Sequence, residues 1–316
     1  MRISAVLCGL AVFAIAVSMR VIAAESPPAR PAPVSPAALL AENVPAPAAR
    51  LAYGKDALEF GELRLPPGKG PFPVVMIVHG GCWADRLPGL DPRATSLDLV
   101  RPLAAALAGD GIATWNVEYR RGGNPGGGWP GTFMDLSHAT DHLRTLAPKY
   151  HLDLSRFVVL GHSSGGQLAL WIAARHRIAP GSAFYTRDPL TPVGVIDLDG
   201  PMDLALAQPH EREYCPLPAI TQFLGATPQD QPQRYHVASA TSYFPLGVPQ
   251  DIVVGGLLDM YDGQVKAYAA QATSKGDRVT VTRLEHSGHF DVLSPQSRDW
   301  KVLVSRIRVI LQDGAN

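Results

Sequence analysis

Residues 157–171 combine three local patterns that few folds accommodate together. Residues 157–160 form a short apolar run without alternation, which predicts a strand buried on both faces. Residues 167–174 are apolar almost all round and rich in Ala and Leu, which predicts a buried helix. Between them stands the sequence Gly161-His162-Ser163-Ser164-Gly165, so a very tight turn must join the strand to the helix.

Ser163 lies at the centre of this predicted turn. A strained strand-to-helix turn projects a serine hydroxyl above the sheet, and the glycines two residues to either side let neighbouring backbone approach closely. The start of the helix also supplies unpaired N–H groups and a dipole that favour an anion. We therefore predict that Ser163 is a nucleophile and not part of a plain glycine-rich turn.

Strand-like and helix-like segments alternate along the rest of the chain. The expected strands cover residues 58–65, 73–78, 112–119, 193–198, 252–255 and 279–284. The expected helices cover residues 102–108, 132–146, 264–272 and 295–311. This βαβα order requires an α/β fold with a parallel sheet and helices on both faces, apart from an early antiparallel strand at 58–65. Residues 200–248 carry many prolines and no strong period, which predicts a short cap.

Composition limits the partners of the chain. Of its 316 residues 46% are hydrophobic, which is ample for a large core, and the 28 basic residues are balanced by 28 acidic ones. A chain without a basic bias is a poor candidate for nucleic-acid binding. We expect a small-molecule partner instead.

The N-terminal residues predict export. Arg2 precedes an apolar run over residues 3–19, and Ala23 and Ala24 follow, which is the layout of a signal peptide over residues 1–24. Cleavage at residues 16–18 and an uncleaved membrane anchor are the alternatives. After processing we expect a periplasmic or secreted protein without stable membrane insertion. Residues 25–50 are rich in Pro and Ala and predict a semi-extended tether before a catalytic domain over 51–316.

A second motif follows the expected strand at 73–78. Residues 79–83 read His-Gly-Gly-Cys-Trp, and adjacent glycines after a buried strand let backbone N–H groups turn toward a neighbouring loop. Such a loop beside Ser163 predicts an oxyanion hole, with the amides of Gly81 and Ser164 as preferred donors and Gly80 and Cys82 as alternatives. A simple strand-ending turn is the competing interpretation.

A serine nucleophile needs a histidine base and a carboxylate that orients it. On a sheet of this kind the acid and then the histidine follow the serine in the chain, each just after a strand. Asp259 and Asp262 both follow the strand at 252–255; Asp262 stands at a helix start, where capping explains it, so we choose Asp259. His289 and His286 both follow the strand at 279–284, and we choose His289 because it lies farther out in a glycine-containing loop.

These motifs together resemble the α/β-hydrolase superfamily. The resemblance rests on HGGCW at 79–83, GHSSGG at 161–166, Asp259 and Gly288-His289-Phe290-Asp291. Within the superfamily the chain is similar to the kynurenine formamidase-like, feruloyl esterase-like and prolyl oligopeptidase-like branch. The resemblance covers residues 50–312 and implies an eight-stranded, mostly parallel sheet. It also implies a serine hydrolase with the triad Ser163, Asp259 and His289 and with no metal or organic cofactor.

The leading functional hypothesis is hydrolysis of small carboxylic esters. Peptide cleavage by this fold usually requires an accessory domain, for which the folded region leaves no room, and export argues against a cytosolic formamidase. An amidase or an exopeptidase remains the alternative, and a non-catalytic binding module of the same fold is a third class. Trp83 and Trp129 are candidates for substrate contact, with ordinary core packing as the competing interpretation.

Cys82 and Cys215 are the two cysteines that remain after removal of the predicted signal peptide. An oxidising compartment favours their pairing, and a bond between them would tie the 79–83 loop to the cap. Two separate buried thiols are the alternative.

Overall fold

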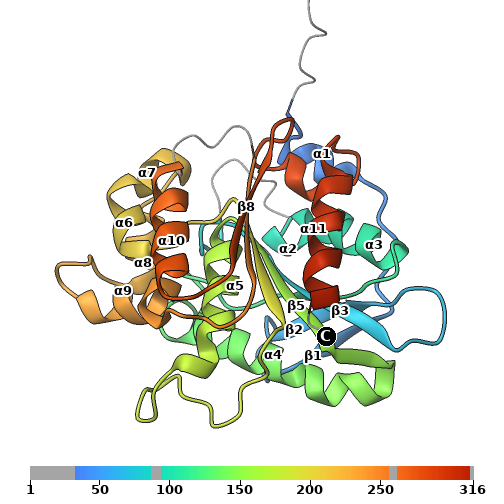
Figure 1. Cartoon of the computed structure of the whole chain (residues 1–316), viewed down its shortest axis with the longest axis horizontal. Helices are drawn as coiled ribbons and strands as arrows, with labels where there is room; N and C mark the ends of the chain where they lie inside the picture. Colours follow the sequence, from blue (N-terminus) through green and yellow to red (C-terminus); the bar gives the residue numbers. More distant parts are fainter. Residues whose placement is uncertain (1–32, 87–93, 256–261, 314–316) are drawn as a thin grey trace, which may run out of the picture. The chain divides into compact units, whose positions relative to one another are not determined.

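The computed structural model of the protein describes residues 33–86, 94–255 and 262–313. An eight-stranded sheet runs through this part of the chain in the order β1-β2-β4-β3-β5-β6-β7-β8 (Figure 1). β2 pairs antiparallel with β1 and with β4, and the remaining neighbours pair parallel, which confirms the predicted sheet. The strands are β1 (Ala49–Ala52), β2 (Phe60–Arg64), β3 (Phe72–Val78), β4 (Ala113–Val117), β5 (Leu152–His162), β6 (Gly194–Leu198), β7 (Gln250–Gly255) and β8 (Val279–Leu284).

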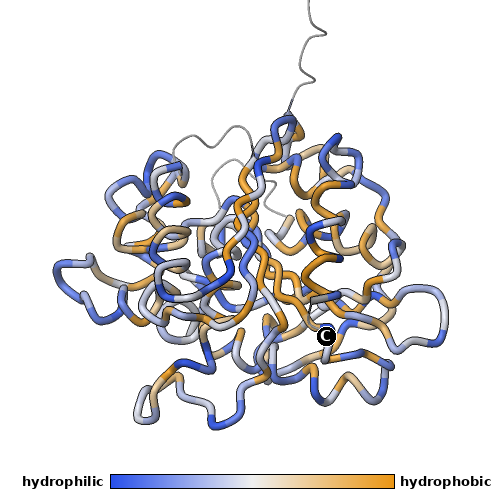
Figure 2. Tube along the Cα trace, in the orientation of Figure 1, coloured by the Kyte–Doolittle hydropathy of each residue, from blue (hydrophilic) through white to orange (hydrophobic). Residues whose placement is uncertain are grey.

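Helices cover both faces of the sheet, and hydrophobic residues concentrate along its strands and the helix sides that face them (Figure 2). The helices are α1 (Pro36–Ala41), α2 (Ser96–Leu99), α3 (Arg101–Gly109), α4 (Gly131–Tyr150), α5 (Ser164–Ala174), α6 (Leu204–Ala207), α7 (Glu211–Tyr214), α8 (Ala219–Leu224), α9 (Pro232–Ala238), α10 (Asp262–Ser274) and α11 (Trp300–Asp313).

β3 shows why its apolar run does not alternate. Val74 and Met76 belong to the hydrophobic cluster that includes residues of α4, α5 and α10, whereas Val75 and Ile77 belong to the cluster with α3 and α11. Successive side chains of a strand point to opposite faces, so a strand covered on both sides needs apolar residues at every position. β5 and β6 are apolar for the same reason. Because β3, β5 and β6 pair parallel, their C-terminal ends lie at the same edge of the sheet.

The predicted cap, residues 200–248, contains the short helices α6 to α9 (Figure 1), in which α6 contacts α9 and α7 contacts α8. Glu211 at the start of α7 joins two of them, because its carboxylate accepts hydrogen bonds from the amides of Ile220 and Thr221 at 2.7 and 3.0 Å. These bonds satisfy N–H groups that the first turn of α8 would otherwise leave unpaired.

The segment before residue 51 differs from the expected tether. Within residues 33–50 the chain forms α1, capped by the Ser35 hydroxyl and opened by Pro36, and then begins β1. Leu39 is buried against the sheet-covering helices, and the Val34 amide donates to Asp291 at 3.1 Å. Burial of Leu39 outweighs the extended preference of the surrounding prolines, so the folded domain begins earlier than the composition suggested.

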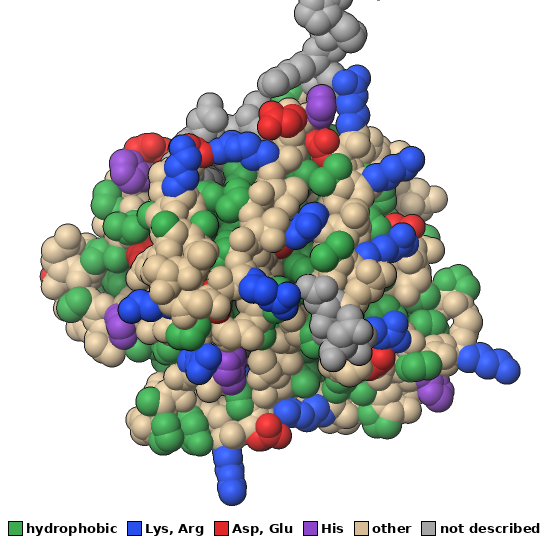
Figure 3. Space-filling model, in the orientation of Figure 1, with side chains coloured by type: hydrophobic (Ala, Val, Ile, Leu, Met, Phe, Trp, Pro, Cys, Tyr) green, Lys and Arg blue, Asp and Glu red, His purple; other side chains and the backbone are tan. Residues whose placement is uncertain are grey.

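The predicted signal peptide, residues 1–24, and the first residues of the tether lie outside the described residues. Within the described ranges no helix has the length and hydrophobicity needed to cross a membrane. On the face drawn in Figure 3, basic and acidic side chains are interspersed among hydrophobic ones.

Candidate active site

Ser163 occupies the tight turn predicted from the sequence. β5 ends at His162 and α5 begins at Ser164. Ser163 between them has φ 56° and ψ −126°, a positive-φ conformation that residues with a side chain rarely adopt. A Cβ on Gly161 would overlap the Gly165 carbonyl, and one on Gly165 would overlap the carbonyl of Val78. Both glycines are therefore required by close packing around the turn.

The residues after β3 lie against this turn, and we call residues 79–83 the HGG loop. A Cβ on Gly80 would stand 2.8 Å from the His162 carbonyl oxygen and 2.9 Å from the Ser163 Cβ, so only glycine fits. Gly81 has φ 106°. The amides of Gly81 and Ser164 donate no hydrogen bond to another described residue, which leaves both N–H groups available to a ligand.

His79 anchors the HGG loop inside the protein. Its Nε2 contacts Glu118 at 3.0 Å, its Nδ1 contacts the Gly80 carbonyl at 2.8 Å, and its ring stacks on Tyr119 at 4.3 Å. Burial alone would raise the pKa of Glu118, but His79 and then Arg121 lower it overall, so this carboxyl is ionised. These three contacts fix the position and orientation of the His79 ring, and with it the start of the HGG loop.

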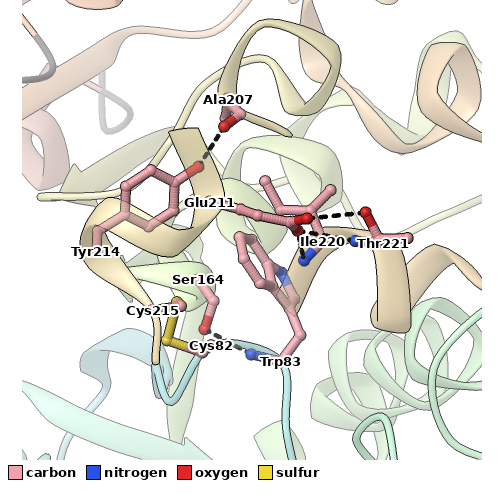
Figure 4. Close-up of a disulfide and its surroundings, with 9 residues drawn as sticks. All are labelled: Cys82, Trp83, Ser164, Ala207, Glu211, Tyr214, Cys215, Ile220 and Thr221. Carbon is pink, nitrogen blue, oxygen red and sulfur yellow. Dashed lines mark hydrogen bonds between the residues drawn. A yellow bond between two sulfur atoms is a disulfide. The ribbon is translucent and has the colours of Figure 1, made fainter. Parts of the chain in front are cut away.

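A disulfide ties the HGG loop to the cap (Figure 4). Cys82 is bonded to Cys215 at the end of α7, with their Cα atoms 6.1 Å apart. The adjacent Trp83 donates from its amide to Ser164 Oγ at 3.3 Å and from its indole to Gln167 at 2.9 Å. The predicted pairing of the two cysteines is thus present in the structure.

His289 lies in the loop that follows β8, and we call residues 285–291 the base loop. Ser163, Gly80, Gly81 and His289 line one cavity of about 290 Å³. His286, in contrast, is half exposed and faces Asp299 at 3.5 Å. The structure therefore brings together the predicted nucleophile, the preferred histidine and the glycines of the HGG loop.

His162, inside the serine motif, holds the base loop. Its Nε2 donates to the His289 carbonyl at 2.8 Å, and the two rings lie 4.5 Å apart. Burial, and then the charge of His289, hold the pKa of His162 well below its usual range. His162 is consequently a neutral residue that positions the base loop, a role that the serine motif alone did not reveal.

The sequence left two candidates for the acid partner, Asp259 and, as the alternative, Asp262. Asp259 lies outside the described residues. Asp262 forms ion pairs with Lys266 and Arg283. The described carboxylate nearest to the base is Asp199, whose Oδ2 lies 3.6 Å from His289 Nδ1. The sequence contains a signal that could have found it, because an acidic residue directly after the apolar strand 193–198 must lie at the edge where Ser163 lies.

The cavity walls are largely apolar. They include Pro36 of α1, Leu99, Val100, Tyr214, Pro216 and Phe290. Neither predicted tryptophan is among its described lining residues. Trp83 is buried against Phe223, at 5.6 Å between ring centroids, and lines a different cavity of about 510 Å³.

Trp129 packs edge-on against Phe133 and Phe184, with centroids 5.5 and 4.9 Å apart. The structure thus gives both tryptophans core contacts and does not bring either to the cavity of Ser163.

Comparisons with known proteins identify a family and a fold. The family model BD-FAE matches residues 62–265. No match was found among curated proteins. Among solved structures, a truncated carbohydrate esterase from gut microbiota is 18% identical with a TM-score of 0.66, covering 84% of this chain and 95% of its own. Esterase B from Lactobacillus rhamnosis is 16% identical with a TM-score of 0.70, covering 89% and 90%.

A thermophilic esterase from Thermogutta terrifontis is 18% identical with a TM-score of 0.62, covering 84% of this chain and 92% of its own. At these identities the likeness concerns the fold alone.

Proposed function

The chain belongs to the BD-FAE family within the α/β-hydrolase superfamily, and from this premise we propose that it is a secreted serine hydrolase that cleaves carboxylic esters. One observation carries the proposal: Ser163, on a left-handed turn at a helix start, lines one cavity with His289, Gly80 and Gly81. That combination supplies a nucleophile, a base and backbone donors at a single place.

The proposed reaction has two halves. Ser163 Oγ attacks the acyl carbon while His289 takes the hydroxyl proton, and the N–H groups of Gly81 and Ser164 hold the oxyanion of the tetrahedral intermediate. Collapse of that intermediate breaks the ester bond, and His289 returns the proton to the departing alcohol. Water then attacks the acyl-enzyme by the same route and releases the acid. The sequence predicts Asp259 as the carboxylate that orients His289.

The cavity favours small acyl groups. Its volume of about 290 Å³ lies at the lower end for ligand sites, and its walls from Leu99, Val100 and Phe290 are apolar. A short aliphatic chain or a single aromatic ring suits such a space, whereas a peptide would need further polar partners for its backbone. We therefore propose esters of small or aromatic acids as the substrate class.

Export belongs to the same proposal. The N-terminal pattern of residues 1–24 supports it, and so does the disulfide between Cys82 and Cys215, because such bonds persist in oxidising compartments. An exported esterase would act on esters outside the cytoplasm.

A substrate panel with a matched variant tests the proposal. Mature protein and Ser163→Ala are assayed on short-chain nitrophenyl esters, aryl formamides and dipeptide amides, and both are treated with an organophosphonate probe. We expect ester turnover to exceed the other two in kcat/KM and the probe to label Ser163 alone. Equal turnover by Ser163→Ala would refute the serine mechanism, and faster cleavage of the formamide or dipeptide would refute the ester assignment.

A further inference from the structure

Asp199 lies on the turn directly after β6, at the sheet edge that carries Ser163. Its φ of 54° is a left-handed conformation that Asp and Asn tolerate better than most residues. The side chain has no exposed surface, and its Oδ2 lies 3.6 Å from Nδ1 of His289. The backbone conformation thus aims a buried carboxylate at the ring of the predicted base.

Contacts with β7 hold this carboxylate in place. The Asp199 amide donates to the carbonyl of Val253 at 2.9 Å, and its Oδ1 accepts from the Gly255 amide at 2.7 Å. A Cβ on Gly255 would stand 2.9 Å from Asp199 Oδ2 and 2.9 Å from the carbonyl of Ser287. Because Gly255 has no side chain, the Asp199 carboxylate and the base loop can approach each other at this point.

The second oxygen of Asp199 is left for His289. Among the described residues neither Asp199 Oδ2 nor His289 Nδ1 has a hydrogen-bond partner. A buried carboxylate oxygen without a partner is costly, so its position next to an unpaired ring nitrogen calls for an explanation. A separation of 3.6 Å is slightly long for a hydrogen bond, and catalytic hydrogen bonds of this kind shorten as the transition state forms.

We propose that Asp199, which follows β6, is the positioning carboxylate of His289 in place of Asp259, which follows β7 in the sequence. The inference rests on the serine-hydrolase function proposed above. Asp199 Oδ2 accepts a hydrogen bond from the Nδ1–H group of His289, so the neutral ring presents an unprotonated Nε2 to the Ser163 hydroxyl. When Nε2 takes that proton, the ionised carboxylate stabilises the imidazolium, which then gives the proton to the leaving alcohol.

Ester turnover by Asp199→Asn, Asp203→Asn and Asp259→Asn tests this assignment. Asn at 199 keeps an acceptor for the Gly255 amide but holds His289 in the wrong tautomer. We therefore expect kcat per folded molecule to fall about 10⁴-fold while KM changes little. Asp203 caps α6 four residues along the chain, so Asp203→Asn removes the same charge nearby as a matched control. Asp203→Asn should keep most of the wild-type kcat, and Asp259→Asn, which removes the acid predicted from the sequence, should lower kcat less than Asp199→Asn does.

The fold of each variant is checked by its thermal unfolding transition. If Asp199→Asn does not fold, Asp199→Gly takes its place, because glycine adopts a left-handed φ without strain. Retention of more than about one tenth of the wild-type kcat by the folded variant would overturn the assignment, since that loss is below 1.4 kcal/mol. A large loss confined to Asp259→Asn would transfer the role to Asp259. Failure of the proposed function looks different: wild-type protein would then neither label at Ser163 nor hydrolyse esters.

Discussion

The HGG loop and the base loop line the same cavity but are held in different ways. The HGG loop is fixed through its side chains. The buried His79 contacts Glu118 and stacks on Tyr119. The indole of Trp83 donates a hydrogen bond to Gln167, and Cys82 is bonded covalently to the cap. Each of these contacts comes from a separate element of the core.

The base loop is fixed mainly through its backbone. The His289 carbonyl accepts from His162, the His286 amide donates to Asp299 at 3.0 Å, and the Gly288 amide donates to Asp291 at 3.1 Å. The His289 ring itself remains 31% exposed and faces Asp199 across 3.6 Å.

The two loops have different tasks in the proposed reaction, and this explains the contrast. Backbone donors that stabilise an oxyanion work best when they are already in place and need no reorganisation. A base must shift its proton between two oxygens, so its ring needs some freedom while its backbone stays fixed. Three predictions test this division, beginning with the largest effect, and a fourth concerns the buried carboxyl next to Asp199.

Loss of the base ring should be the most damaging change. We expect His289→Ala to lower kcat by at least about 10⁴-fold, because Ser163 then has no group to take its proton. His286→Ala is the matched control, since His286 pairs with Asp299 at the protein surface and should keep nearly full activity. Stopped assays with nitrophenyl esters and phosphonate labelling measure both, and the reverse ranking would show that the wrong histidine was chosen.

Rigidity of the HGG loop should matter next. In Gly80→Ala the added methyl would meet the His162 carbonyl at 2.8 Å and push the loop away from Ser163. We expect kcat to fall by about 10² to 10³, the usual effect of losing an oxyanion donor. Gly109→Ala, where a methyl meets nothing within 4 Å, should behave as wild type. Comparable kcat in both variants would mean that the loop is not held as closely as its contacts indicate.

The disulfide should contribute more to stability than to rate. Its cysteines are 133 residues apart, and a loop of that length gives up to about 5 kcal/mol in the entropy model. Denaturant unfolding of wild type and of Cys82→Ser/Cys215→Ser, each with and without reductant, measures the effect. Reductant should destabilise the wild type alone; a wild-type unfolding free energy that reductant leaves unchanged would contradict this.

The smallest effect concerns Asp197, two residues before Asp199. Burial, and then the charge of Asp199, raise the pKa of Asp197 well above its usual range, so it is protonated in the folded protein. A raised pKa in the folded state means that the folded protein holds this proton more tightly than the unfolded chain does. The stability that the protonated carboxyl contributes is therefore present in full below the unfolded pKa of about 4 and declines as the pH rises above it.

Asp197→Asn cannot ionise and keeps the acceptor for the Gly200 amide. The stability of Asp197→Asn minus that of the wild type should therefore increase as the pH rises from about 4 to 7, because only the wild type loses stability in that range. Parallel curves for the two proteins, measured by urea unfolding, would count against a protonated Asp197.

Much of the fold was predictable because its signals are local. The unbroken apolar strands, the serine turn and the HGG loop each follow from residues adjacent in the sequence, and steric limits force glycine at 80, 161 and 165. The cysteine pairing was predictable from counting, since the chain leaves two cysteines after the expected cleavage. These inferences required no knowledge of which segments meet in space.

The features that were missed depend on contacts between distant segments. The proximity of Asp199 to His289 arises because the turn after β6 meets the base loop. The role of His162 depends on its hydrogen bond to the His289 carbonyl, 127 residues away in the sequence. Trp83 and Trp129 are aromatic residues near the motifs, yet their surroundings are core side chains. Aromatic residues alone do not distinguish a cavity wall from a core.

The position of α1 affects when the cavity can form during synthesis of the chain. Pro36 forms part of the cavity wall, and its segment is joined to the far end of the chain, because the Val34 amide bonds to Asp291 and Glu42 accepts from Ser294 at 3.4 Å. This segment is synthesised early and therefore finds its partners only after nearly the whole polypeptide has emerged. A partly made chain cannot enclose the cavity, so a competent acyl site should form only when synthesis is nearly finished.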